Sequence, residues 1–484
     1  MTQDPVRDPV RDPVPFARSN QDLGAYVRGA AGLLVQPRMG MSDPRAMAEG
    51  LRAVSTVGPQ AIGTITLDSY TRVGDHEGAR AALDGGGQLN GFPIVLLGPE
   101  VTREVAAAAG DRPVQVRHGS AMPQQIFRTM VRAGLSISEG GPVSYCLPYG
   151  RTPLAESVAH WRDATQELAE SCRERGRRAH LETFGGCLLG QLCPPSLLVA
   201  ISLLEAMFFV QNGVRSVSLS YAQQTDQQQD LEALAALRHL AALLLGPEVD
   251  WHVVLYTYMG QFPGTVAGAN LLVHRSAELA VLGGADRIIV KTSAEAYRLP
   301  TVAENVESLR AVSATARRCA ELPGAEQVDY AQMLQEVSAL IGAVLQLSDD
   351  IGTGLLKAFA AGLIDVPFCL HQDNRGETSS AIDDGGRLVW AATGNMPLTR
   401  RFRRDDGPRI TSGELLRMLR HTADEHDRSA LAAAPRGPVA EAVTGSAAEA
   451  SAPSAPPAAD RLPGDVLEVE AGPQHTYWAT ACTH

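Results

Sequence analysis

The stretch that decides the fold lies in the middle of the chain, where Val214-Arg215-Ser216-Val217-Ser218-Leu219-Ser220-Tyr221 precedes a helical pattern and then Trp251-His252-Val253-Val254-Leu255-Tyr256-Thr257. Both short runs are rich in β-branched and aromatic residues, which is typical of buried strands. Between them, apolar residues recur every three or four positions over Asp230–Leu245, which predicts a helix. The stretch therefore predicts a strand–helix–strand unit.

The same alternation continues on both sides of this unit. Helical patterns occupy Leu154–Arg175 and Ser196–Asn212, and Pro194-Pro195 before the second is a helix start signal. The other expected strands are Ile62–Arg72, Phe92–Gly98, Val114–His118, either Leu135–Glu139 or Val143–Tyr149, His180–Phe184, and Arg287–Thr292. Eight strands alternating with helices predict an α/β fold, a (β/α)8 TIM barrel, with a doubly wound sheet as the alternative.

Length and composition divide the chain into segments. The 484 residues are 45% hydrophobic, which is typical of a globular protein. After Thr292 the pattern is mostly helical to about Gly362, and a polar, Gly-rich piece covers His371–Asn395. We expect four segments: a flexible N-terminal tail (1–24), a catalytic barrel (25–310), a C-terminal extension packed on the barrel (311–428) and an Ala/Pro-rich disordered tail (429–484).

Charge and hydropathy argue against several classes of partner. The net charge of −12 argues against nucleic acid, because phosphate binding needs a basic face. No apolar run reaches the length of about eighteen residues that a membrane helix needs, and the N-terminus lacks the apolar region of a signal peptide. The seven cysteines have neither zinc nor redox spacing. We expect a cytoplasmic protein with free thiols, no metal site and no membrane partner.

Three arginines stand where a barrel would place its active site. Arg72 and Arg117 lie at the ends of expected strands, and Arg38 follows an apolar run that precedes the barrel. A guanidinium group matches a carboxylate or phosphate, so three together would bind a ligand with two acidic groups, such as a dicarboxylic acid. Each arginine alone is more often a surface or salt-bridged residue. The hypothesis is therefore that the three arginine side chains meet at one end of the barrel.

Other polar residues near the expected strand ends are candidates for the same site. Glu139, before two glycines, could act as a general base or bind an amine, or be an ordinary loop residue. Tyr145 and Tyr149 could donate hydrogen bonds to a carboxylate or simply pack, and His118 could be a base or a structural histidine.

Lysine is rare in this chain, which contains only Lys291 and Lys357. Lys291 ends an expected strand and stands four residues before Glu295. The spacing is compatible with a surface ion pair on a helix, but the strand-end position makes a role in a pocket at least as plausible.

Taken together, nine short runs resemble the large catalytic component of glutamate mutase, also called methylaspartate mutase, its epsilon or E subunit. They occur in the order of that family, and the similarity extends from about Leu33 to about Thr399. The runs are Gln36–Gly40, Asp68–Arg72, Leu89–Pro93, Arg117–Gly119, Glu139–Gly141, Ser144-Tyr145, Pro148-Tyr149, Gly260–Pro263 and Ile289–Thr292.

The resemblance implies an isomerase subunit that interconverts L-glutamate and (2S,3S)-3-methylaspartate by a radical carbon-skeleton rearrangement with adenosylcobalamin. The cobalt ligand would come from a small cobalamin-binding subunit, in an assembly of two large and two small subunits. Consistently, Asp75-His76-Glu77-Gly78 lacks the Asp-x-His-x-x-Gly spacing of cobalt-ligating loops. The alternatives are a non-catalytic paralogue that binds an amino dicarboxylate or scaffolds a partner, and a cobalamin-independent barrel lyase or isomerase acting on a dicarboxylate.

The resemblance also implies individual roles. Glu139 would hold the substrate amino group and act as its base. The residues implied at the substrate are Arg38, Arg72, Arg117, His118, Glu139, Tyr145 and Tyr149. Those implied at the cofactor are Gly40, Asn90, Pro148, Phe262, Lys291, Glu295 and Leu299. The chain departs from the family around Glu182, where an Arg usually precedes the Glu and a Pro follows it, and over residues 368–387.

Overall fold

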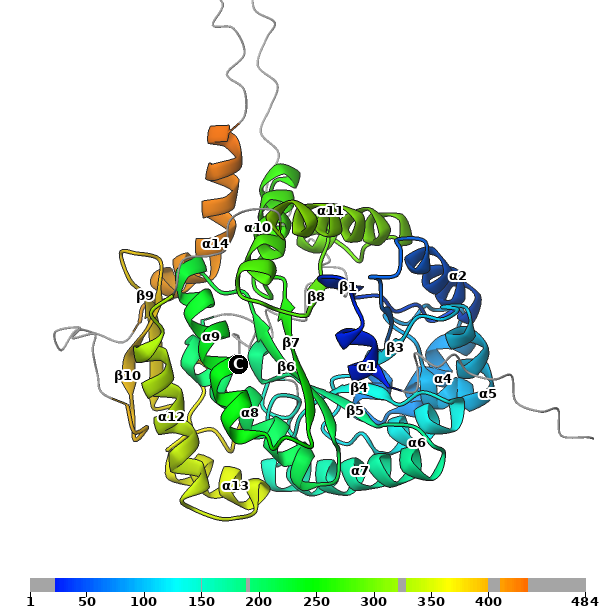
Figure 1. Ribbon diagram of the computed structural model, residues 1–484, viewed down its shortest axis with the longest axis horizontal. Helices are drawn as coiled ribbons and strands as arrows, with labels where there is room; N and C mark the ends of the chain where they lie inside the picture. Colours follow the sequence, from blue (N-terminus) through cyan, green and yellow to red (C-terminus); the bar gives the residue numbers. More distant parts are fainter. Residues whose placement is uncertain (1–21, 149, 189–191, 321–327, 399–409, 434–484) are drawn as a thin grey trace, which may run out of the picture.

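Eight short parallel strands form the centre of the protein (Figure 1). The computed structural model describes residues 22–148, 150–188, 192–320, 328–398 and 410–433. Each strand pairs with its neighbours in chain order, and the last pairs with the first, with Leu34 opposite Arg287. A bridge between Val35 and Ala61 completes the ring. The strands are β1 Leu34–Pro37, β2 Gly63–Thr66, β3 Val114–Arg117, β4 Ile137–Gly140, β5 His180–Thr183, β6 Ser216–Ala222, β7 Asp250–Tyr256 and β8 Arg287–Val290. The predicted (β/α)8 barrel is confirmed.

Helices surround the strands, as parallel connections require. Outward-facing strand residues such as Val116, Leu181 and Ile288 are fully buried beneath them. The surrounding helices are α2 Pro44–Ser55, α5 Ile94–Ala107, α6 Gln124–Ala133, α7 Leu154–Glu174, α8 Pro195–Gln211, α9 Gln227–Leu244, α10 Val266–Leu282 and α11 Val302–Ala320. Helix α8 is apolar on nearly every side because it lies between the barrel, α9 and the later helix α12.

The predicted number of strands is right, but one strand was assigned wrongly. The run Phe92–Gly98 is not a strand: Phe92 makes an isolated bridge to Leu67, and α5 begins at Ile94. The missing strand is Leu34–Pro37, which the sequence pattern placed before the barrel. A short apolar run has no period long enough to distinguish a buried strand from the first turns of a buried helix.

Two other expected strands also need adjustment. The strand expected over Ile62–Arg72 ends at Thr66, because Asp68 accepts a hydrogen bond from the Thr71 backbone N–H and begins the short helix α3, Ser69–Val73. For the fourth strand, the choice near Leu135–Glu139 is correct, and residues 142–148 form turns instead.

The interior of the barrel is a polar network. The side-chain amide of Gln36 donates to Thr64 Oγ1 at 2.9 Å and to Gln115 Oε1 at 2.6 Å. Arg287 is fully buried and donates to the carboxylate of Glu182. It also bonds Gln36, Ser218 and His252. The interior is therefore stable only while each buried charge keeps its partners.

A short helix closes the N-terminal end of the barrel. Helix α1, Leu23–Arg28, lies within the ring of strands in Figure 1 and packs Leu23 and Val27 on Ile62 and Ile137. Its last residue, Arg28, forms an ion pair with Asp250 at the start of β7. In TIM-barrel enzymes the active site lies at the opposite end, where the strands finish.

The C-terminal region packs against one side of the barrel. It contains α12 Ala331–Leu345, α13 Ile351–Ala361, the hairpin β9 Thr378–Ile382 with β10 Leu388–Thr393, and α14 Ser412–Ala433. The helices contact α7, α8, α9 and α10 (Figure 1). The hairpin occupies the segment that was expected only to be polar and Gly-rich. The expected boundary after residue 310 lies within α11, and the expected tails, 1–24 and 429–484, fall almost entirely outside the described residues.

Two further findings concern the described residues alone. No helix among them is long and apolar enough to cross a bilayer. The described cysteines are free thiols, buried except for the partly exposed Cys319.

Arg287 offers a direct test of the polar interior. Arg287→Met removes the cation but leaves Glu182 buried, so we expect the free energy of unfolding to fall by about 3–5 kcal/mol. Urea unfolding followed by circular dichroism measures this. Arg80→Met, on an exposed position of helix α4 (His76–Asp84), serves as the control and should change stability by less than about 0.5 kcal/mol. Equal stability of the two variants would contradict a structural role for the network.

Candidate active site

A buried ion pair stands at the carboxyl ends of two neighbouring strands. Arg117 ends β3, and its guanidinium lies 2.7 Å from the Glu139 carboxylate on β4. The hydroxyl of Tyr145 donates to the other oxygen of Glu139. These three side chains are at most 4% exposed, so the pair is shielded from water. The structure thus brings together three residues that the sequence placed at the site.

Two glycines allow Tyr145 to turn back onto Glu139. Gly140 has a φ of +128°, and a Cβ there would lie 2.5 Å from both the Trp161 and the Tyr145 rings. A Cβ on Gly141 would lie 2.0 Å from the carboxyl group of Glu205. The two glycines after Glu139 are therefore required by a tight turn, in which any side chain at either position would clash with its neighbours.

Glu205, on α8, anchors the loop that carries Tyr145. Its carboxylate accepts hydrogen bonds from the backbone N–H groups of Val143 at 3.2 Å and Ser144 at 2.9 Å, and from the Ser144 hydroxyl at 2.9 Å. Burial raises the pKa of Glu205 to about 7, although these donors oppose the shift. The sequence analysis did not single out this residue, because a lone Glu in an apolar helix carries no motif.

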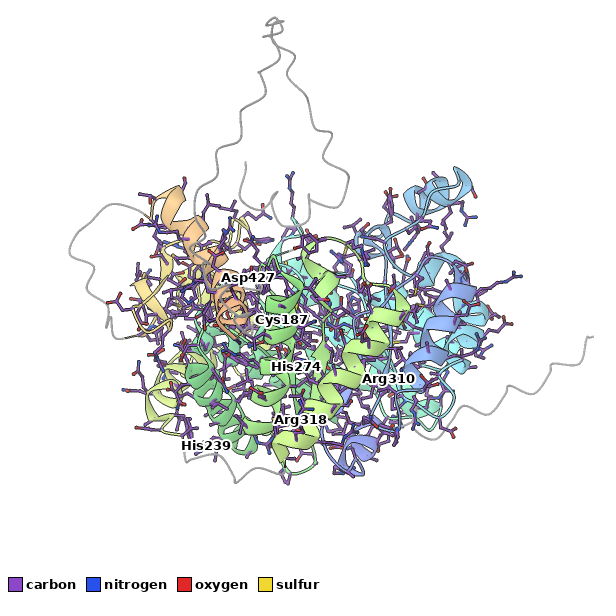
Figure 2. The ribbon with its side chains drawn as sticks, turned by 90° about the horizontal axis from the view of Figure 1, so that it is seen from above. Cys187, His239, His274, Arg310, Arg318 and Asp427 are labelled. Atoms are coloured by element: carbon purple, nitrogen blue, oxygen red, sulfur yellow. The ribbon has the colours of Figure 1, made fainter. Side chains whose placement is uncertain are left out.

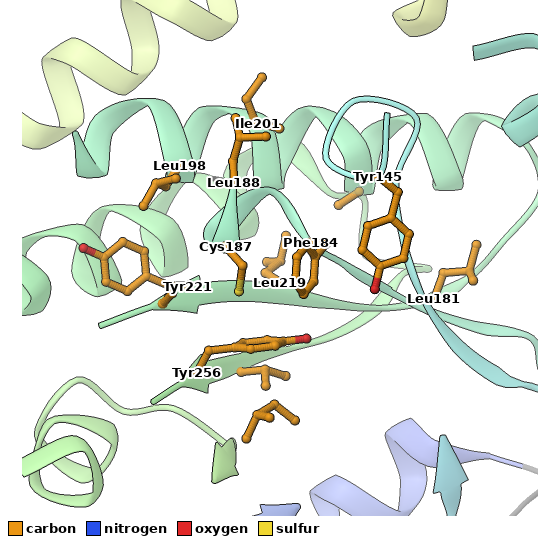
Figure 3. Close-up of a cluster of buried hydrophobic side chains, with 14 of the residues drawn as sticks. Tyr145, Leu181, Phe184, Cys187, Leu188, Leu198, Ile201, Leu219, Tyr221 and Tyr256 are labelled. Atoms are coloured by element: carbon orange, nitrogen blue, oxygen red, sulfur yellow. The ribbon is translucent and has the colours of Figure 1, made fainter. Parts of the chain in front are cut away.

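Two further side chains of the site were missed by the sequence analysis. Tyr256, on β7, accepts a hydrogen bond from Arg117 at 3.0 Å, and its hydroxyl group lies within hydrogen-bond distance of the carboxylates of both Glu139 and Glu182. Glu182, on β5, lies 3.6 Å from Arg117 and also pairs with Arg287. Figure 3 shows the hydroxyl groups of Tyr145 and Tyr256 directed toward one region from different elements. An acidic side chain within a strand of the barrel, as at Glu182 in β5, was the available signal.

The pKa values of the Glu139 and Glu182 carboxyl groups are shifted in opposite directions. Burial raises the pKa of Glu139 more than the Arg117 guanidinium lowers it. Burial acts on Glu182 too, but two guanidinium groups, those of Arg287 and Arg117, hold its pKa below the usual value. Glu182 is thus the fixed anion of the network, whereas Glu139 is the carboxylate suited to exchange a proton.

Aromatic rings form a wall beside the ion pair. His118 stacks on Trp161 with centroids 5.7 Å apart and meets the edges of Tyr145 and Phe127. Phe184 extends this aromatic wall on the far side of Tyr145. Burial, followed by the charges of Arg72 and Arg117, lowers the pKa of His118 to about 3.

His118 is therefore a neutral imidazole with a defined tautomer. Its Nδ1 accepts from the Ser120 N–H at 3.0 Å, so the proton sits on Nε2. Nε2 is buried and lies near the backbone of Glu139. His118 is therefore a neutral, packed imidazole rather than a base.

Arg72 approaches the same place from α3. Its Nε lies 3.3 Å from the backbone oxygen of His118, and its side chain is half-buried. Asn90 supports this helix, because its side-chain oxygen accepts from the Ser69 N–H at 2.9 Å. Asn90 thus holds the turn before Arg72, in addition to any contact with a ligand.

A second cluster joins the ends of β1 and β8. Lys291 Nζ lies 3.3 Å from the Glu295 carboxylate and 4.7 Å from the centre of the Phe262 ring. Arg38 lies 3.8 Å from the same carboxylate. Burial lowers the pKa of Lys291, although Glu295 opposes the shift. Glu295 belongs to the short helix η3, Ser293–Ala296, so the pair is a largely buried contact and not a surface pair on a long helix.

The remaining predicted residues lie less centrally. Gly40 packs against the end of β2, where a Cβ would lie 2.2 Å from the Thr66 backbone oxygen. Pro148 is half-buried in the loop after Tyr145, and Leu299 is 57% exposed beyond η3. Tyr149 lies outside the described residues. Within the described chain, no group of three His, Cys, Asp or Glu side chains is arranged to hold a metal ion.

Comparison with known proteins decides the family. The sequence profile of the methylaspartate mutase E chain (MutE) family matches residues 21–412. The chain belongs to this family. It is 34% identical to the glutamate mutase epsilon subunit of Haloarcula marismortui over 369 residues, 73% of this chain and 74% of that one. It is 33% identical to the epsilon subunit of Halobacterium salinarum over 384 residues, 77% of this chain and 80% of that one.

A bacterial relative gives the same result. The epsilon subunit of Desulfitobacterium hafniense is 31% identical over 390 residues, which covers 78% of this chain and 80% of the relative. The family assignment made from the nine runs is confirmed. All the residues predicted for the site lie within the part of the chain that the methylaspartate mutase E chain profile matches.

Glu205 predicts a pH dependence of stability. The pKa of Glu205 rises from 4.5 in the unfolded chain to about 7 in the folded protein. The folded protein therefore has its full stability below pH 4.5, where Glu205 is protonated in both states, and loses this contribution as the pH rises through about 7. Glu205→Gln cannot ionise. We therefore expect the unfolding free energy of the wild type, relative to Glu205→Gln, to fall by roughly 3 kcal/mol between pH 5 and pH 8. Urea titrations across this range measure the difference, and Glu156→Gln, at an exposed position, is the control. Parallel curves would show that Glu205 does not titrate in this range.

Proposed function

We propose that this chain is the catalytic subunit of an adenosylcobalamin-dependent isomerase that interconverts L-glutamate and (2S,3S)-3-methylaspartate by a radical rearrangement. The observation that carries the proposal is the buried Arg117–Glu139 pair at the barrel mouth, with Tyr145 on the carboxylate and Arg72 beside it. Family membership adds independent support.

The charges of the site match those of an amino dicarboxylate. L-Glutamate carries two carboxylates and one ammonium group. Arg38, Arg72 and Arg117 supply cationic donors for the carboxylates, and Glu139 supplies an anion for the ammonium group. Since the pKa of Glu139 is raised, this carboxylate can also take a proton from the ammonium group and return it.

The surrounding residues hold the substrate and exclude water. Clamping at both ends keeps two fragments close while a carbon–carbon bond is broken and remade. The aromatic wall, with the neutral His118 within it, borders the ion pair and keeps water away from it.

The second cluster fits the nucleoside part of adenosylcobalamin. Lys291 offers a compact three-donor cation and Glu295 an acceptor 3.3 Å away, which together suit ribose hydroxyl groups. Phe262 gives an apolar face, and Gly40 leaves no side chain at the end of β1. Asn90, Pro148 and Leu299 complete the proposed cofactor side. When bound, adenosylcobalamin supplies the radical chemistry.

The proposal includes a partner and a cellular setting. A small cobalamin-binding subunit would provide the cobalt ligand, in an assembly of two large and two small subunits in the cytoplasm. We further propose that residues 25–310 form the catalytic barrel and 311–428 an extension that supports it.

The decisive experiment combines the chain with a family small subunit and adenosylcobalamin, and follows conversion of L-glutamate to 3-methylaspartate. Product together with a cobalt(II) radical signal by electron paramagnetic resonance is the expected result. Glutamate binding without product or signal, in a folded complex, would indicate a non-catalytic paralogue. Turnover of a dicarboxylate without cobalamin would indicate a lyase or a different isomerase.

Arg117→Lys tests the substrate clamp. A lysine keeps the charge but loses the planar fork that bonds two acceptors, so we expect kcat/KM to fall on the order of 100-fold. Arg128→Lys, on the exposed face of α6, should retain wild-type activity. Unchanged turnover of Arg117→Lys would remove the clamp from the proposal.

The two lysines provide a matched pair for testing the cofactor side. Lys291→Met should raise the apparent Kd for adenosylcobalamin at least about tenfold, because a hydrogen-bonded cation is lost from a buried position. Lys357→Met, at an exposed lysine that bonds the backbone oxygen of Leu347, should bind as the wild type does. Equilibrium binding to the assembled complex measures both, and equal affinities would contradict the assignment of Lys291.

A further inference from the structure

Helix α14 begins where the family match ends. The profile match stops at residue 412, and α14 spans Ser412–Ala433. The helix lies along α10 (Figure 1) and buries Thr422, Ala423 and His426. It is therefore firmly packed on the barrel even though it lies beyond the part of the chain that defines the family.

One side chain of α14 holds the turn that begins α10. The Asp427 carboxylate accepts from the Gly264 N–H at 2.8 Å and from the Thr265 N–H at 3.0 Å. It also accepts from the Thr265 hydroxyl, and that hydroxyl oxygen accepts from the Gly268 N–H at 3.0 Å as the helix cap. Figure 2 shows Asp427 on α14 beside the barrel wall. Both amides at this turn thus depend on Asp427.

The same turn is joined to the second cluster. Phe262 precedes it by two residues and presents its ring to Lys291. The Tyr297 hydroxyl, one residue beyond η3, donates to the Gly264 backbone oxygen. The turn is therefore fixed between Asp427 and the segment that carries Lys291 and Glu295.

We propose that Asp427 is a positioning residue for the cofactor side of the site, because it fixes the Gly264–Thr265 turn and so keeps the Phe262 ring against Lys291. This inference rests on the proposed function. It assigns to the C-terminal helix a role in cofactor affinity rather than in substrate binding, because Asp427 bonds the turn that follows Phe262, whereas Arg117 and Glu139 pair with each other at the ends of β3 and β4.

A neighbouring ion pair separates this role from simple docking of the helix. Glu425 lies 3.5 Å from Arg275 of α10, so it joins the same two helices without touching the turn. Asp424, on the same helix, is exposed and forms an ion pair with Arg420 at 3.5 Å. Glu425→Gln and Asp424→Ala are therefore matched controls.

The test measures the turn and the cofactor separately. In the free subunit, Asp427→Ala should speed hydrogen exchange of the Gly264 and Thr265 amides, read by mass spectrometry. In the assembled complex it should raise the Kd for adenosylcobalamin roughly fivefold, the effect of losing a helix cap, with kcat and the KM for L-glutamate within about twofold of wild type. Asp427→Asn, which keeps one acceptor oxygen, should give an intermediate Kd, and both controls should match the wild type.

Three outcomes overturn the inference: unchanged exchange at the turn, faster exchange with unchanged cofactor affinity, or an equal loss of affinity in Glu425→Gln. A wild-type complex that bound no adenosylcobalamin would refute the proposed function instead. The two failures are thus distinguishable, because the inference is judged only against a wild type that binds the cofactor.

Discussion

The structure depends on one compensated run of buried charges, Arg287–Glu182–Arg117–Glu139, that crosses the barrel from its interior to its mouth. Two cations and two anions alternate along it, and Tyr256 bonds both carboxylates. Taking any one of these charges out of the sequence leaves its neighbour desolvated without a partner, which costs far more than the pair itself contributes. This network stabilises the polar interior of the barrel. It also holds Arg117 and Glu139 as a fixed ion pair at the carboxyl ends of their strands.

The loops at the mouth are held from outside the barrel. Glu205 fixes the turn before Tyr145 from within α8. Asp373 in the C-terminal region accepts from the Leu154 N–H at 2.7 Å, at the end of the same loop, and Trp390 of β10 donates to Ser196 at the start of α8. Asp427 of α14 accepts a hydrogen bond from the Gly264 N–H and so fixes the turn before α10. The C-terminal region thus fixes, by hydrogen bonds, loops at the carboxyl ends of the strands, where loops are usually more mobile than the strands and helices that they connect.

Arg38 is placed differently from the expectation. Arg38 was predicted at the substrate, yet its ion-pair partner is Glu295, predicted at the cofactor. Because β1 pairs with β8, the residues that follow these two strands are neighbours. Barrel closure thus brings Arg38, from the beginning of the barrel, to Lys291 and Glu295 at its end.

The sequence by itself determined the alternation of strands and helices, the strand-end positions of Arg117, Glu139 and Lys291, and the family, because these are written in local periodicity and short motifs. It could not decide that Phe92–Gly98 opens a helix, since a short apolar run is compatible with either structure. Nor could it find the contacts that Glu182, Tyr256, Glu205 and Asp427 make. Their roles arise from contacts with residues far away in the chain, and only closure of the barrel, the parallel register and the docking of the C-terminal helices bring those residues together.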